Sequence, residues 1–240
     1  MAKITKDRLE RSVRILLTIT VILIMIRQIM LREWEFVFLC IFTLIMFSIP
    51  SIIDKRYKVR LPIGIELSIY AISFCTAILG EIQEYYLKIS GWDKLMHFSC
   101  GMGLAAIFVF ILTVVDKESK RLNISIFYKA IFVFCFTITA LVFWEFFEFA
   151  ADNVLGKDMQ KDVIVDKITS VTLNENKRNK PVKVKVDSLK INEEDWIKKY
   201  GGYLDIGLYD TMYDLLLGAL GAGVYSVGSY YYLKKKSIEK

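Results

Sequence analysis

The sequence predicts an all-α polytopic membrane protein, with about six transmembrane helices and a small extracytoplasmic β-hairpin/helix insert. The chain is 55% hydrophobic and has a mean hydropathy of +0.41, which is far more apolar than a soluble domain of 240 residues. Several apolar stretches approach the roughly 20 residues that a helix needs to cross the hydrocarbon core. We expect spans over residues 13–30, 34–53, 62–86, 93–115, 126–151 and 208–233.

The distribution of basic residues predicts how these spans are oriented. Lysines and arginines cluster in the N-terminal tail, after the second span, after the fourth span (Lys117, Lys120 and Arg121) and at the C-terminus. These segments alternate with turns poor in both, so the positive-inside rule places both termini in the cytoplasm and requires an even number of spans. The chain then divides into helices one to five (1–151), an extracytoplasmic insert (152–207) and the sixth helix with a basic tail (208–240). Because the net charge of +6 belongs to the flanks of apolar spans, we expect a lipid bilayer and no nucleic acid as partner.

The long polar segment between the fifth and sixth spans has a pattern of its own. Residues 163–173 and 181–189 are β-branched and partly alternating, which is typical of a β-hairpin with a long turn. Asn192 can then cap a short helix that has acidic residues in its first turn and lysines in its last, and that stops at Gly201 and Gly202. We therefore expect a small hairpin-and-helix cap outside the membrane.

Acidic residues from several spans fall at one membrane depth, together with the chain's single histidine. Asp93 and His97 open the fourth span one turn apart, and Asp210 and Asp214 open the sixth in the same way. The fifth span closes with acids at spacings of three and four, which also keep one helix face: Glu145, Glu148 and Asp152. In the predicted topology these ends share the outer interface.

Some of these residues also have a simpler explanation than a functional site. Asp93 and Asp210 lie at helix N-termini, where the helix dipole stabilises a carboxylate by about 0.3–1 kcal/mol. Glu145 and Glu148 lie at the opposite, unfavourable end of a span, where a charged group usually faces a cavity and has a partner. His97 alone is more commonly a helix residue hydrogen-bonded to a neighbour, and gains interest only because Asp93 shares its face.

Carboxylates this close together raise one another's pKa or are held together by a cation. Few lysines lie near them in the sequence, so a divalent metal is the simplest compensation. Mixed Asp, Glu and His ligands suit zinc, manganese or iron, whereas carboxylates alone suit magnesium or calcium. We thus expect a divalent metal ion (Zn, Mn or Mg). Its candidate ligands are Asp93, His97, Glu148, Asp152, Asp210 and Asp214.

Four stretches carry a resemblance to known families. They are W-D-K-L-M-H-F-S-C-G (92–101), W-E-F-F-E-F-A-A-D (144–152), D-M-Q-K-D (158–162) and G-Y-L-D-I-G-L-Y-D-T-M-Y-D-L (202–215). As a set they resemble a family of uncharacterised multi-spanning membrane proteins seen often in Firmicutes, and more distantly the YjdF and VanZ-like groups. The resemblance implies a bacterial plasma-membrane protein and adds Asp158 and Asp162 to the candidate metal ligands. It supplies no activity.

Three functions are compatible with this pattern. The first is a membrane-embedded metal-dependent hydrolase or transferase acting on a lipid-linked envelope substrate, with Glu145 and Glu148 as catalytic carboxylates. The second is a cation- or proton-coupled transporter, for which Glu66 is the one candidate polar group near the inner side. The third is a non-catalytic envelope protein that binds a structural ion. The sequence leaves the choice between enzyme and non-enzyme open.

Overall fold

The computed structural model describes residues 2–118 and 124–239, and this part of the chain is mainly helical. Lys120 and Arg121, expected in a basic loop, lie outside it. The long helices are α1 (Ala2–Leu31), α2 (Trp34–Tyr57), α3 (Ile63–Ser73) continued by the π-helix η1 (Phe74–Ile82), α5 (Trp92–Glu118), α6 (Ile126–Leu155) and α8 (Leu208–Ile238). The short helices are α4 (Tyr85–Lys88), α7 (Trp196–Tyr200) and the 3-10 turn η2 (Val171–Leu173).

Among the described residues, five helical segments are long and apolar enough to cross a membrane. They are Arg8–Leu31, Trp34–Tyr57, Ile63–Ile82, Trp92–Asp116 and Ile126–Leu155. The expected polytopic helical fold with a small strand insert is therefore confirmed. The sixth expected span corresponds to α8, which forms a long helix but is not among the five apolar segments. Acids at its start and glycines, serines and tyrosines along its length make α8 more polar, so its crossing of the membrane stays a prediction.

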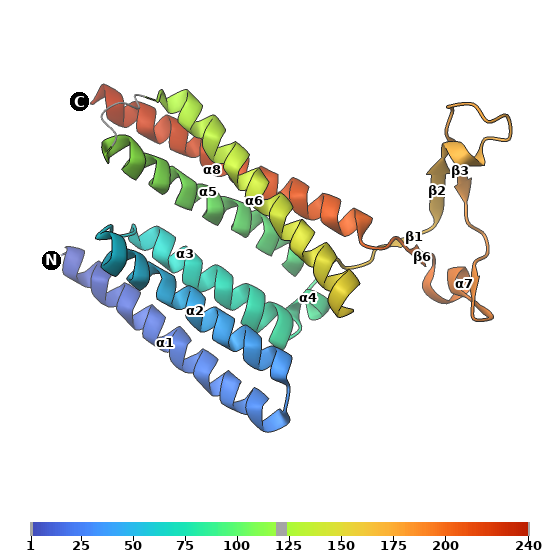
Figure 1. Ribbon diagram of the computed structural model, residues 1–240, viewed down its shortest axis with the longest axis horizontal. Coiled ribbons are helices and arrows are strands. Elements are labelled where there is room, and N and C mark those ends of the chain that lie inside the picture. The colour runs from blue at the N-terminus through green and yellow to red at the C-terminus, as the bar shows by residue number, and fades with distance from the viewer. Residues whose placement is uncertain (1, 119–123, 240) are drawn as a thin grey trace. The chain divides into compact units, whose positions relative to one another are not determined.

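The chain forms two compact units, and their boundaries fall inside helices. Residues 1–141 and 215–240 make the first unit, and residues 142–214 make the second. Helices α6 and α8 each contribute to both. The first residues of α1 and the last residues of α8 lie at the same end of the first unit (Figure 1).

In the first unit, α1, α2 and α3 lie side by side (Figure 1). Their apolar faces meet in a core that includes Val21 of α1, Phe47 of α2 and Tyr70 of α3, with Ile78 of η1. These residues are all buried, and the Phe47 and Tyr70 rings meet edge to face at 5.5 Å. Many large apolar side chains on the outer faces of the long helices are exposed, as expected for faces in contact with lipid.

The second half of the first unit is formed by α5, α6 and α8. Ala105 of α5, Val133 of α6 and Ala222 of α8 form one buried cluster. One turn earlier on α8, Gly218 lies against Gly101 of α5 and Leu141 of α6. From residue 218 to residue 222 of α8, the contacting residue number rises on α5, from 101 to 105, and falls on α6, from 141 to 133. Helix α8 is therefore parallel to α5 and antiparallel to α6.

The third span differs from the single helix expected over residues 62–86. Its α-helical part ends at Ser73, and the π-helix η1 carries the chain on to Ile82. Glu84 then has a left-handed backbone conformation, with φ of 61°, and the chain turns back into α4. The Tyr86 ring fills the space where a Cβ would stand on Gly80, which explains how the returning chain packs so closely on η1. The expectation that this helix continues to residue 86 is therefore wrong, because the helical run ends at Ile82.

The insert contains three small antiparallel pairs of strands. Strand β2 (Lys167–Ser170) pairs with β3 (Val182–Lys185), so the expected hairpin with a long turn is confirmed, with shorter strands. Strand β1 (Ile164–Val165) pairs instead with β6 (Tyr203–Leu204), which joins the two ends of the insert.

The third pair changes the expected capping of the short helix. Strand β4 (Lys190–Ile191) pairs with β5 (Glu194–Asp195), and Asn192 and Glu193 form the tight turn between them with positive φ. Helix α7 is capped by Asp195, whose carboxylate accepts hydrogen bonds from the Ile197 and Lys198 amides. Asn192 is therefore not the cap. The expected stop at Gly201 is confirmed, since this residue has φ of 81° at the helix C-terminus.

Candidate metal centre

The candidate centre starts from the first turns of α5. Gly91 has a positive φ of 81°, which glycine adopts without steric cost, and α5 begins at the next residue. Asp93 lies in the first turn, where the helix dipole favours a carboxylate. His97 follows one turn later on the same face, and its Nε2 atom lies 3.4 Å from Asp93 Oδ1.

Close packing of α5 on α8 sets the position of the third member. A Cβ on Gly101 would overlap the Gly218 carbonyl, and a Cβ on Gly221 would overlap the Phe98 carbonyl. A residue with a Cβ at either position would force the two helix backbones apart, so the small glycines permit this approach. His97 lies one turn before Gly101, and Asp214 lies one turn before Gly218 on the continuous helix α8.

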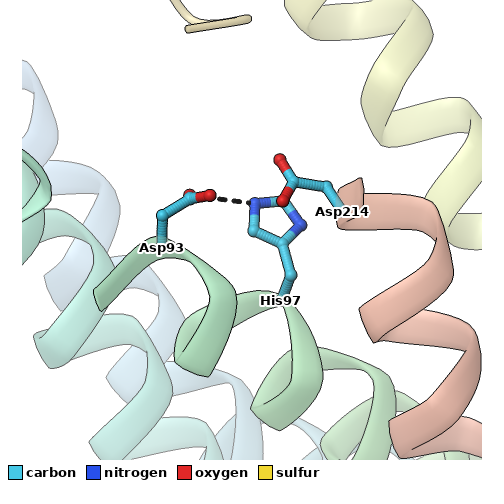
Figure 2. A group of neighbouring side chains, drawn as sticks. All are labelled: Asp93, His97 and Asp214. Carbon is cyan, nitrogen blue, oxygen red and sulfur yellow. Dashed lines mark ion pairs between the residues drawn. The ribbon is translucent and has the colours of Figure 1, made fainter. Parts of the chain in front are cut away.

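Asp93, His97 and Asp214 form a group in which one ligand atom from each lies within 4.8 Å of the others. Figure 2 shows the two α5 side chains and the α8 carboxylate turned toward one another. Asp214 is 2% exposed, whereas the side chains of His97 and Asp93 are 14% and 30% exposed. The group therefore combines a buried carboxylate on α8 with two partly exposed side chains on α5.

One separation within this group, that between His97 and Asp93, is compatible with two ligands of a small divalent metal. Two ligands of a tetrahedral zinc ion, each about 2.0–2.2 Å from the metal, lie about 3.4 Å apart. This is the separation of His97 Nε2 and Asp93 Oδ1, 3.4 Å. One imidazole and two carboxylates leave at least one coordination position for water or substrate, as in catalytic zinc sites.

Glu145 and Glu148 are buried, at 5% and 7% exposure. Trp144 Nε1 donates a hydrogen bond to Glu148 Oε1 at 2.7 Å, which fixes one carboxylate oxygen. Glu145 lies one turn beyond Leu141, the α6 residue that packs on Gly218. Since α6 and α8 are antiparallel, the turn from Leu141 to Glu145 on α6 corresponds to the turn from Gly218 to Asp214 on α8. Glu145 and Asp214 both belong to the second unit.

Asp152 and Asp210 have different surroundings from those expected. The two oxygens of Asp152 accept hydrogen bonds from the backbone amides of Met159 and Gln160, at 2.6 and 2.8 Å. Asp210 Oδ2 accepts one from the Lys161 amide at 2.7 Å. These carboxylates therefore fold the loop that follows α6 against the helix ends, a role that the sequence pattern did not indicate.

Asp158 and Asp162 lie in that same loop. The Lys161 ammonium contacts the carbonyl oxygen of Asp158 and lies 4.0 Å from its carboxylate, which is 70% exposed. Partial burial and the nearby carboxylate of Asp158 raise the pKa of Asp162, and the Asp205 and Asp152 carboxylates add to this, while a hydrogen bond from the Gly207 amide opposes it. Within the described residues, neither acid belongs to a group of three close metal-ligand side chains.

The structure thus brings together three of the expected ligands, Asp93, His97 and Asp214. Glu148, Asp152, Asp158, Asp162 and Asp210 do not belong to that group. Sequence reasoning missed Asp205, whose carboxylate accepts hydrogen bonds from the Val163 and Tyr209 amides at 2.7 and 2.6 Å. The sequence signal for this role was an acid three residues before the start of α8, followed by Gly207.

These features define a polytopic membrane protein with a group of Asp and His ligands at the ends of two of its helices. The chain belongs to the family described as "Predicted membrane protein (DUF2238)", whose model matches residues 10–235. The expected membership of a multi-spanning membrane protein family is confirmed at this level. The narrower resemblance to the Firmicutes, YjdF and VanZ-like groups stays a prediction.

The chain is also similar to a protein of Thermotoga maritima that carries the name "Uncharacterized protein". The two are 26% identical over 152 residues, which cover 63% of this chain and 77% of the relative. No solved structure matches the chain.

Proposed function

We propose that Asp93, His97 and Asp214 hold a divalent metal ion, and that the protein is a membrane-embedded metal-dependent hydrolase or transferase. The observation that carries the proposal is the convergence of their ligand atoms within 4.8 Å from two helices that are distant in the sequence. An imidazole with two carboxylates favours zinc or manganese, and magnesium is the less suited alternative because it prefers oxygen ligands.

A metal with an open position would lower the pKa of a bound water or polarise a phosphoryl or carbonyl oxygen of the substrate. His97 Nε2 and Asp93 Oδ1, which lie 3.4 Å apart, would both face the metal, and the carboxylate of Asp214 would balance its charge from the buried side. Glu145 is our candidate general base, because it is buried one turn beyond the Leu141–Gly218 contact. Glu148, fixed by Trp144, would support it.

The location of the group favours a lipid-linked substrate of the cell envelope. Asp93 and His97 lie in the first turns of α5, at one end of an apolar segment that is long enough to span a membrane. A centre at this depth meets the headgroup region, where lipid-linked phosphates lie. With the orientation expected from the basic flanks, this is the outer leaflet of a bacterial plasma membrane.

Metal content tests the proposal directly. The detergent-purified protein is compared with His97→Ala and Asp214→Asn by metal analysis, with size-exclusion chromatography and circular dichroism as checks of folding. Asp158→Asn is the matched control, since it removes an exposed acid of the insert. We expect about one zinc or manganese per wild-type and control chain and loss of the metal in both site variants. A metal-free wild type, or folded site variants that keep the metal, would refute the centre.

Activity separates an enzyme from a protein with a structural ion. A Glu145→Gln variant that keeps its metal is expected to lose hydrolysis or transfer on lipid-linked phosphate substrates. If wild type and variant both bind metal and neither acts on such substrates, the ion is structural.

Transport is a second candidate, because polar groups also meet in α1 and α3. The Tyr70 hydroxyl donates a hydrogen bond to Glu10 Oε1 at 3.0 Å, Arg14 Nε lies 3.6 Å from the same oxygen, and Glu66 is 8% exposed. A cation or proton pathway needs such groups on both sides of the membrane. Proton and cation flux in proteoliposomes, compared between wild type and Glu66→Gln, tests this function. Absence of flux in wild type would exclude it.

A further inference from the structure

The β2–β3 hairpin of the insert has one basic face. Its register places Lys167 opposite Lys185 and Thr169 opposite Lys183. Because side chains alternate across a strand, these four residues share one face, and all of them are exposed. Ile168 and Val184 are paired on the other face and are 39% and 38% exposed.

The charge of this hairpin is strongly unbalanced. Residues 167–185 contain six basic side chains (Lys167, Lys177, Arg178, Lys180, Lys183 and Lys185) and one acid (Glu175), which gives 6 − 1 = +5. Asp166 lies beside the basic face, with its carboxylate 3.8 Å from Lys167 Nζ. Like charges directly opposite each other destabilise a strand pair, and a two-stranded hairpin has little stability of its own. An anionic surface on this face would remove the repulsion.

We propose that the lysine face of the β2–β3 hairpin binds the anionic phospholipid headgroups of the membrane in which this protein lies. Complementary charge between the lysines and the anionic headgroups supplies the attraction. This surface is separate from the candidate metal centre and does not depend on it.

The connection of the hairpin to α6 favours the membrane over a soluble polyanion. The Gln160 amide is hydrogen-bonded to Asp152 in the last turns of α6, and Lys167 follows seven residues later. Seven residues reach at most about 25 Å, so the hairpin stays close to the end of a membrane-spanning segment. Such a tether keeps the local concentration of headgroups around the lysines high, whatever the orientation of the protein.

Hydrogen exchange of the full-length protein in lipid nanodiscs tests this proposal. One set of nanodiscs contains phosphatidylcholine alone, and the other contains equal parts of phosphatidylcholine and phosphatidylglycerol. The variant is Lys167→Gln/Lys183→Gln/Lys185→Gln. The control, Lys190→Gln/Lys198→Gln/Lys199→Gln, removes the same charge from lysines of which two already have acidic partners, Asp195 and Glu194.

We expect phosphatidylglycerol to slow amide exchange over residues 167–185 severalfold in wild type and control, and not in the lysine-face variant. High salt should abolish the effect, since the screening length falls from about 10 Å at 0.1 M to about 3 Å at 1 M. Each lysine near an anionic surface is expected to change occupancy about fivefold. Exchange in phosphatidylcholine alone shows whether the variants still form the hairpin.

Three outcomes would overturn the proposal. The first is equal exchange in both nanodiscs for wild type. The second is equal loss of protection in the control variant, which would mean that net charge alone is responsible. The third is protection by added polyphosphate in phosphatidylcholine nanodiscs without protection by phosphatidylglycerol, which would assign the face to a soluble polyanion. If the lysine-face variant does not form its hairpin, the proposal is tested by wild type alone, through its exchange in the two kinds of nanodisc at low and high salt.

Discussion

Asp214 lies one helical turn before Gly218, and Gly218 is the α8 residue whose carbonyl lies against Gly101 of α5. The same single turn separates His97 from Gly101 on α5. The group of Asp93, His97 and Asp214 therefore depends on a contact between glycines that are not themselves ligands. Disturbing that contact is expected to affect the group as strongly as changing a ligand.

Gly101→Ala tests this dependence. The added methyl group would overlap the Gly218 carbonyl, so the helices must separate, and overpacking of this kind costs about 1–3 kcal/mol. We expect a lower midpoint of thermal unfolding in detergent and loss of bound metal. Gly228→Ala is the control, because nothing lies within 4 Å of a Cβ there, and alanine in a helix is about 0.5–1 kcal/mol more favourable than glycine. A Gly101→Ala protein as stable as wild type would contradict the packing.

Trp144→Phe removes the donor that fixes Glu148. The indole N–H at 2.7 Å is hydrogen-bonded to a carboxylate that is 7% exposed. Loss of a hydrogen bond to a buried charged group costs about 1.5–3 kcal/mol. We expect a decrease in thermal stability that is absent from Trp34→Phe, whose side chain is 64% exposed. Equal decreases in the two variants would show that the indole bond is not the cause.

Asp205→Ala should release the base of the insert. One carboxylate oxygen accepts from the Val163 amide and the other from the Tyr209 amide. Without them, two amides lose their acceptor, and we expect faster hydrogen exchange at residues 163 and 209 together with easier proteolysis of the insert. Each bond to a charged group corresponds to about 1.5–3 kcal/mol, less where water can replace the carboxylate. Asp187→Ala, an exposed acid of the same insert, should leave exchange unchanged.

Asp162→Asn should change how stability depends on pH. Because the pKa of Asp162 in the folded protein is raised above its ordinary value of 3.8, the folded state binds the proton more tightly than the unfolded state. The free energy of unfolding therefore falls as pH rises from 3.8 through the pKa of the folded state. The reason is that the charged carboxylate is less favourable in the folded protein than in the unfolded protein. The asparagine variant should lose this decline, so its stability relative to wild type increases from about pH 4 to about pH 7. Thermal unfolding at both pH values measures the difference, and a difference independent of pH would contradict the prediction.

Some of the candidate centre could be predicted from the sequence, and some could not. The spacing of Asp93 and His97 is a local property of one helix, so a single turn places them on one face and the structure brings them to 3.4 Å. For Asp152 and Asp210, membrane depth alone suggested the same role. In the structure, their oxygens instead accept hydrogen bonds from the backbone amides of residues 159–161. Depth in a span does not reveal whether a backbone amide or another side chain meets a carboxylate.

The sequence by itself determined the elements that follow from composition and local periodicity. Apolar runs of sufficient length form the spans, alternating β-branched residues form the β2–β3 hairpin, and Gly201 ends α7. Tertiary structure alone decided which acid from another helix joins Asp93 and His97. That choice depends on the rotation of each helix about its axis, which is set by the closest backbone contact, here between Gly101 and Gly218. Because this contact joins residues far apart in the chain, no local pattern of charges or apolar residues contains it.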